Sequence, residues 1–257
     1  MGLSNLNALS IAELVIYAPL TVIACAVSIR HGFHPLKGWI FLFIFCALHI
    51  VGAALNLATI SSPMVIAFVT VPIELFAIGQ VVIIYVILGV LARVADSINK
   101  ERPTTLKALY IHLVRIPFIA GIILVIIGTD ASNATWSTTG IYPINELTKI
   151  GFIIFIATFA VLVLMVFVFM PRRSQAEAPS RLLYDIIIAS LPFMLVRIIY
   201  SLLITFVDNA AFNPITGNVA ARGFLATVEE MIITILYIYV GLKLPKLPKE
   251  VVVQTSE

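Results

Sequence analysis

Charged residues are scarce in this chain. Asp, Glu, Lys and Arg together make up 11% of its 257 residues, whereas hydrophobic residues make up 61% and the mean hydropathy is +1.11. This composition excludes a soluble globular domain and is typical of an integral membrane protein. We therefore expect the lipid bilayer to be a partner of the chain, and we expect no nucleic acid.

Histidine and cysteine are also few, with four and two residues. A histidine-rich di-iron enzyme needs more ligands than that, and bis-histidine haem ligation needs two histidines at similar depth, whereas His49 lies mid-span and His112 near the end of its span. Cys25 and Cys46 fall in apolar runs, where cysteine is a small packing residue. The sequence has no GxSxG, HExxH or P-loop motif, and no lysine in the middle of the last span for retinal. We therefore expect no metal and no cofactor.

Long apolar runs are abundant instead. Runs of about 18 residues or more predict seven membrane spans: roughly 10–29, 38–58, 64–92, 110–128, 148–170, 182–206 and 223–241. Only short linkers separate them. The sequence therefore predicts an all-α polytopic membrane protein, in which residues 1–257 form one domain, a bundle of seven transmembrane helices.

Basic residues gather in alternate linkers. Twelve of the 16 lie in the first, third and fifth linkers and in the carboxyl-terminal tail: Arg30, Lys37, Arg93, Lys100, Arg102, Lys107, Arg172, Arg173, Arg181, Lys243, Lys246 and Lys249. The positive-inside rule places these segments in the cytosol. The amino terminus is then lumenal or outside, and the carboxyl terminus is cytosolic. A glycosylation sequon, Asn133-Ala134-Thr135, falls in a linker on the predicted lumenal side.

A few ionisable side chains interrupt the apolar spans. Arg197 lies within the sixth span, and the pair Glu229-Glu230 lies within the seventh. A charge at bilayer depth costs on the order of 3 kcal/mol, so it normally faces the bundle interior and finds a partner. Helical spacing places Glu230 on a polar stripe with Thr234 and Tyr237, whereas Glu229 is the better candidate to bridge to a neighbouring helix.

The polar residues of the spans gather in the predicted lumenal half. They come from five helices and are Glu13, Asn56, Glu74, Arg197, Tyr200, Ser201, Asp208, Glu229 and Glu230. We predict that they form one lumen-side pocket, capped by the loop around Asn213 and Pro214. Two plainer readings stand beside this prediction. Arg197 pairs with one glutamate only to lock the bundle, and Glu13 is an interfacial acid favoured by the helix dipole.

Buried carboxyl groups, an arginine and tyrosines within an apolar wall suit acid chemistry on a hydrophobic substrate. A carboxyl group in a dry apolar site is favoured in its protonated form and can act as a general acid. Such an acid can protonate an alkene or an epoxide that is held against it. Aromatic faces can then stabilise the resulting cation.

Several stretches resemble a family of fungal seven-span proteins. They are the opening LSNLNALSIAELVIYAP, RHGF followed by GWIFLFIF, LPFMLVRIIYSLL in the sixth span, and FNPITGN followed by EEMIITILYIYVG. This family includes the integral-membrane terpene cyclases of ascochlorin and macrophorin type, which cyclise the prenyl chain of meroterpenoids. The resemblance covers nearly the whole chain and implies such a cyclase. Its motifs mark the family and carry no catalytic signature.

We therefore expect a membrane enzyme of the fungal endoplasmic reticulum that cyclises a hydrophobic prenylated small molecule by protonating its terminal alkene or epoxide. Glu74 and Glu230 are the candidate acids, and Arg197 sets their protonation or orients a polar head group. The expected substrate-binding residues are Asn56, Tyr200, Glu229, Tyr237 and Glu13. The alternative function is a transporter or lipid-translocating protein, in which the same charges form a gate or proton relay. A receptor-like binding protein ranks third, because the cytosolic linkers are short.

Overall fold

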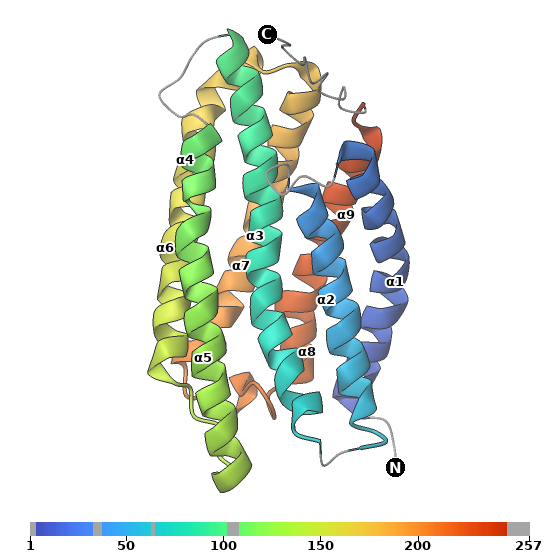
Figure 1. Ribbon diagram of the computed structural model, residues 1–257, viewed down its shortest axis with the longest axis vertical. Coiled ribbons are helices and arrows are strands. Elements are labelled where there is room, and N and C mark those ends of the chain that lie inside the picture. The colour runs from blue at the N-terminus through green and yellow to red at the C-terminus, as the bar shows by residue number, and fades with distance from the viewer. Residues whose placement is uncertain (1–3, 33–37, 63–64, 102–107, 246–257) are drawn as a thin grey trace, which may run out of the picture.

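The apolar runs form seven long helices, as the sequence predicts (Figure 1). The computed structural model describes residues 4–32, 38–62, 65–101 and 108–245, and this part of the chain contains no β-strand. The long helices have the length and composition of a multi-pass integral membrane protein. The helices are α1 (Asn5–His31), α2 (Trp39–Ala58), α3 (Ala67–Glu101), α4 (Ala108–Leu113), α5 (Arg115–Thr139), α6 (Glu146–Phe169), α7 (Ala178–Phe206), α8 (Val219–Arg222) and α9 (Val228–Lys243). Three shorter helical segments are η2 (Met170–Gln175), η3 (Ala210–Phe212) and the π-helical turn η4 (Gly223–Thr227).

Helix α3 lies at the centre of the bundle. Every side chain from Gln80 to Ala92 is buried, which is the pattern of a helix surrounded by protein. Helix α3 contacts α2, α5, α6 and α7, while α1 packs against α2 and α9. Figure 1 shows the α5–α6 pair on one side of α3 and the α1–α2 pair on the other. Polar groups on α3 therefore face other helices.

The fourth span is longer than its hydropathy predicts. The sequence predicted it over 110–128, whereas α5 continues to Thr139 and the short helix α4 precedes it. The added turns are polar but are held by tertiary contacts, since Ser132 is buried and its Oγ accepts a hydrogen bond from the backbone N of Asn145 at 3.3 Å. The predicted linker around Asn133 is therefore wrong, because the sequon lies inside a helix.

The third and seventh spans also differ from their predicted bounds. The third was predicted over 64–92, and α3 runs from Ala67 to Glu101. The seventh was predicted over 223–241, and the continuous segment α8–η4–α9 runs from Val219 to Lys243. In both spans the helix continues through polar residues at one end. The length of the apolar run alone does not predict this continuation.

Small residues bring α5 and α6 close together. A Cβ atom added to Gly128 would collide with the backbone N and Oγ1 of Thr148, and one added to Gly151 would meet the carbonyl oxygen of Gly121. Close backbone approach at small residues is a usual basis of helix association in membranes. This contact fixes the α5–α6 pair as one wall of the bundle.

The chain starts and finishes its spans at opposite ends of the bundle, as an odd number of spans requires (Figure 1). We call the end where α1 begins and α7 ends the proximal end, and the other the distal end. At the distal end the Arg30 guanidinium donates to the carbonyl oxygen of Leu244 at 2.9 Å, and Arg173 pairs with Asp185. Five basic residues used in the orientation argument lie outside the described residues: Lys37, Arg102, Lys107, Lys246 and Lys249. The cytosolic position of the distal end stays a prediction from charge.

Candidate functional site

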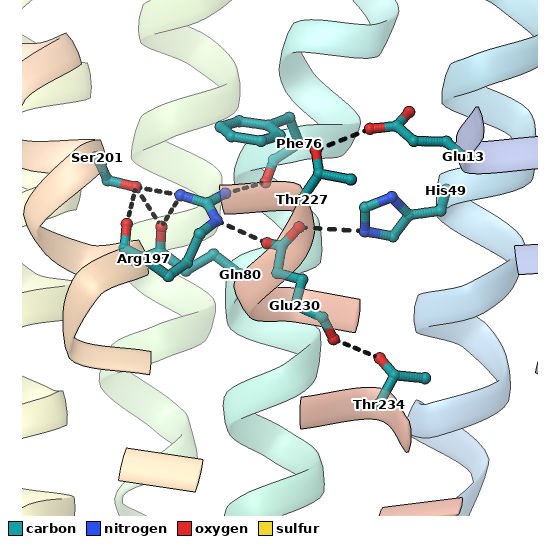
Figure 2. A network of polar contacts seen from close by, with 9 residues as sticks. All are labelled: Glu13, His49, Phe76, Gln80, Arg197, Ser201, Thr227, Glu230 and Thr234. Atoms are coloured by element: carbon teal, nitrogen blue, oxygen red, sulfur yellow. Dashed lines mark hydrogen bonds and ion pairs between the residues drawn. The ribbon is translucent and has the colours of Figure 1, made fainter. Parts of the chain in front are cut away.

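Arg197 is the centre of a buried polar network that joins four helices (Figure 2). Helix α7 places Arg197 and Ser201 one turn apart, α3 supplies Gln80, α9 supplies Glu230 and α2 supplies His49. The Arg197 side chain is fully buried. Its Nε donates to Glu230 Oε1 at 2.6 Å, and its NH1 group donates to Gln80 Oε1 at 3.0 Å and to Ser201 Oγ at 2.5 Å. The buried charge therefore has partners on two other helices, as a charge at bilayer depth requires.

The main chain and an aromatic ring complete the surroundings of the guanidinium group. Its NH2 group donates to the carbonyl oxygen of Phe76 at 2.9 Å, and its Cζ atom lies 3.9 Å from the centroid of the Phe76 ring. Four of the five N–H donors of Arg197 are therefore committed to protein acceptors. These hydrogen bonds hold the Arg197 guanidinium group rigidly, because each of them fixes the orientation of its plane.

Glu230 lies between Arg197 and His49, as Figure 2 shows. One carboxyl oxygen accepts from Arg197, and the other lies 3.2 Å from His49 Nε2. The His49 ring stacks on Tyr17 of α1, with centroids 4.0 Å apart and planes 8° apart. The network thus extends from α7 through α9 to α2 and α1. This geometry matches the plainer reading in which Arg197 and a glutamate lock the bundle.

A cavity of about 230 Å³ lies beside this network at the proximal end. Its wall is mainly apolar and aromatic, and it includes Arg197, Tyr200 and Ser201. The loop with Asn213 and Pro214 also lines it, as predicted. Asn213 fixes that loop, since its Oδ1 accepts from the backbone N of Ile215 at 2.9 Å. The cavity therefore has a rigid rim and a floor that carries positive charge.

Arg222 brings a second guanidinium group to the cavity. Its Cζ atom lies 4.9 Å from the Phe76 ring centroid, on the same ring that Arg197 contacts. Arg222 Nε is buried without a hydrogen-bond partner among the described residues. None of the described residues that line the cavity is acidic. The cavity therefore offers the unused N–H donors and the unpaired positive charge of Arg222, which suit an acidic or electron-rich polar group.

Tyr142 also lines the cavity and lies in the turn between α5 and α6. The side chains of Ser132 and Thr129 line the same cavity. Burial raises the pKa of Tyr142 to about 12, and the negative charges of Glu74 and Asp130 raise it further in the same direction. Tyr142 is therefore a neutral hydroxyl donor or acceptor at physiological pH.

The structure separates the predicted catalytic residues. Arg197 lines the cavity, and Glu230 lies behind it in the network. Glu74 is half-buried between α3 and α5, where its Oε1 accepts from Asn133 Nδ2 at 3.1 Å beside Asp130. Neither Glu74 nor Glu230 is among the cavity-lining residues. Arg197 and Glu230 are brought together, and Glu74 is not.

The predicted substrate-binding residues are spread over several places. Tyr200 lines the cavity and contacts the Phe76 ring edge-on, whereas Tyr237 is fully buried with its hydroxyl 3.5 Å from Ser190 Oγ. Asn56 is buried near the end of α2, away from the cavity-lining set, and Glu229 is half-buried with one oxygen that has no partner among the described residues. Glu13 is buried on α1 and accepts a hydrogen bond from Thr227.

Sequence reasoning missed four residues of the site: His49, Phe76, Gln80 and Arg222. His49 and Gln80 carried a usable signal, because each is a polar residue deep in an apolar span. Arg222 lies at the start of the seventh span, where a basic residue is ordinarily explained by the lipid interface. Phe76 gave no signal, since its role depends on a backbone carbonyl and a ring face.

No curated protein and no solved structure matches this chain. A family model described as a domain of unknown function, DUF7702, matches residues 3–247. That match covers nearly the whole chain, including every helix described above. The protein therefore belongs to the DUF7702 family.

Proposed function

We propose that this protein binds an amphiphile with a hydrocarbon tail and an acidic or electron-rich head group, and that it cyclises the prenyl tail of that molecule. The proposed binding rests on the proximal cavity. Two guanidinium groups and many apolar and aromatic residues line it, and none of the described lining residues is acidic. An uncompensated charge near the bilayer is unfavourable, so a ligand that supplies negative charge or hydrogen-bond acceptors is favoured.

The head group binds at Arg222. This guanidinium has unused donors, whereas those of Arg197 are mostly committed within the bundle. Both guanidinium groups and Tyr200 line the same cavity. A phenolate or carboxylate placed here receives charge-assisted hydrogen bonds from Arg222 and lies in the positive field of Arg197.

The proposed reaction rests on the sequence resemblance to meroterpenoid cyclases, which implies an enzyme of the fungal endoplasmic reticulum. The positions of Glu74 and Glu230 argue that neither meets a substrate in the cavity, since one is bound to Asn133 and the other to Arg197.

The test uses the full chain in yeast microsomes with a farnesylated phenol, with and without a terminal epoxide. We expect a product of unchanged mass with one fewer double bond or no epoxide, identified by chromatography, mass spectrometry and NMR. Arg222→Gln should weaken substrate binding about 10- to 100-fold, the worth of a charged hydrogen bond. Arg173→Gln at the distal end is the matched control and should bind normally. Equal binding by both variants would refute the head-group assignment.

Translocation of the same amphiphile is the second candidate function. It is favoured by the lack of an acidic residue among the described residues of the cavity wall, since a carrier needs only to bind. The two functions separate in reconstituted vesicles. A carrier moves the intact farnesylated phenol between leaflets, whereas a cyclase converts it in detergent micelles without any membrane barrier.

A further inference from the structure

A second hollow, of about 420 Å³, lies between α1 and the α8–η4–α9 segment. We call it the α1/α9 groove and define it by Leu9, Ala12, Glu13, Ile16, Phe224 and Met231. Its wall is apolar except for Glu13 and a few polar side chains, and Phe224 at its edge is 71% exposed. On α1 the lining runs from Asn5 to Ile16, which is about 16 Å of helix. The groove has the shape and chemistry for a hydrocarbon chain.

The groove adjoins the proximal cavity. Asn5, Asn218 and Val219 line both hollows. The tail of a molecule whose head group lies at Arg222 therefore has the groove beside it, across these three residues. This adjacency is the reason to assign the groove to the tail of the amphiphile whose head lies in the cavity.

The π-helical turn η4 provides one wall of the groove. It begins at Gly223, which faces α1, since a Cβ atom there would be in ordinary van der Waals contact with Leu9 Cδ1, 3.6 Å away. Single π-turns within α-helices are rare and occur frequently at functional sites. The turn ends at Thr227, and the Thr227 hydroxyl donates to Glu13 Oε1 at 2.9 Å (Figure 2).

Glu13 is the one acidic residue among the described residues that line the groove. It is 6% exposed, and it also borders a small hole shared with His49 and Arg222. A chain that fills the groove is therefore in contact with a carboxyl group that is shielded from water. Neither Glu74 nor Glu230 has such a position.

We propose that the α1/α9 groove binds the hydrocarbon tail of the amphiphile, and that Glu13 is the carboxyl group that the tail contacts and the acid that starts cyclisation. This proposal rests on the proposed function. The Glu13 O–H bond breaks as the terminal alkene forms a new C–H bond, which leaves a carboxylate and a tertiary carbocation. The next alkene attacks that cation and closes a ring, and a proton lost from the final cation returns to the carboxylate. The product is an isomer, and no other reactant is consumed.

The tail site is tested by binding. Ala12→Trp fills the groove, and Ala18→Trp adds the same side chain at an exposed alanine of α1 that does not line it. A phenol with a saturated C15 tail serves as the unreactive probe, and the same phenol with a methyl group serves as the head-only probe. We expect Ala12→Trp to weaken binding of the long probe about tenfold or more, as displacing two methylene groups would do, and to leave the head-only probe unaffected. Equal binding of the long probe by both tryptophan variants would overturn the tail site.

The role of Glu13 is tested with the reactive farnesylated phenol. Glu13→Gln keeps the acceptor for Thr227 and should bind the long probe normally but form no isomer, whereas Glu13→Asp should keep some turnover. Size-exclusion profiles verify that each variant is folded, and Thr227→Val serves as a second variant that should lower turnover without abolishing it. Isomer formation by Glu13→Gln at the wild-type rate would overturn the catalytic assignment. If the wild type forms no isomer, the proposed reaction and this assignment fall together, while the Ala12→Trp result still decides the tail site.

Discussion

Removing the charge of Arg197 should destabilise the bundle more than any exposed substitution of the same kind. Arg197→Met keeps much of the volume but leaves Glu230 as a buried carboxylate without its guanidinium partner. Breaking a buried ion pair by removing one partner costs about 3–5 kcal/mol. The lost interhelical bonds to Gln80 and to the Phe76 carbonyl add about 1 kcal/mol, at the average for membrane proteins.

A second substitution tests whether the loss of stability comes from the unpaired Glu230 carboxylate. If the penalty comes from an uncompensated carboxylate, then adding Glu230→Gln to Arg197→Met should restore part of the lost stability. In a double-mutant cycle, the double variant should therefore be more stable than the sum of the two single-variant effects predicts. A model in which Glu230 packs as an independent polar residue predicts the opposite, namely a further loss.

The assay is unfolding of the purified protein by increasing SDS in mixed micelles, followed by circular dichroism. The control is Arg173→Met, which removes an arginine from the exposed pair with Asp185 at the distal end and should have little effect. The reasoning is refuted if Arg197→Met unfolds at the same SDS fraction as Arg173→Met, or if the Arg197→Met, Glu230→Gln double variant is less stable than Arg197→Met alone.

Three further predictions concern other parts of the fold. Gly128→Ala should destabilise the protein by about 1–3 kcal/mol in the same SDS assay, because the new methyl group collides with α6. Gly52→Ala is the control and should be tolerated, since its Cβ atom would lie 3.9 Å from Leu75 Cδ1. The pKa of Tyr142 is about 12 in the folded protein and near 10 in the unfolded chain, so the neutral hydroxyl stabilises the fold fully below pH 10, and this stabilisation is lost as the pH rises through 12. Unfolding curves at pH 9 and 11.5 should therefore show a smaller loss of stability at the higher pH for Tyr142→Phe than for the wild type. Asn133→Gln should leave electrophoretic mobility unchanged, because the Asn133 amide lies in a helix and binds Glu74, and a glycan-dependent shift would contradict this.

The number and type of helices could be predicted from the sequence because each is set by a local property. A run of about 20 apolar residues has no alternative to a spanning helix in a membrane. The end of α5 could not be predicted in the same way. Thr129 and Ser132 lower the hydropathy there, and the helix continues because Ser132 is buried against the turn that follows α5.

The position of Glu230 followed from helical periodicity, whereas that of Glu74 did not. The stripe with Thr234 and Tyr237 placed Glu230 toward the bundle interior, and the structure has it there, fully buried. For Glu74 the periodicity gives a face of α3 but not the helix that covers it. In the structure that helix is α5, whose unexpected length supplies Asn133 as a partner. Because the end of α5 was not predicted, the partner of Glu74 was not predicted either.

The two arginines of the cavity have different roles because they differ in how many donors are free. Arg197 directs four of its five N–H groups to protein acceptors, so a ligand can gain little from it beyond its positive field. The Arg222 guanidinium group contacts the Phe76 ring but has no hydrogen bond or ion pair with a described residue, so its donors are available to a head group. Substituting Arg222 should therefore change binding with little change in stability. Substituting Arg197 should change both binding and stability, because Arg197 lines the cavity and also joins the helices of the bundle.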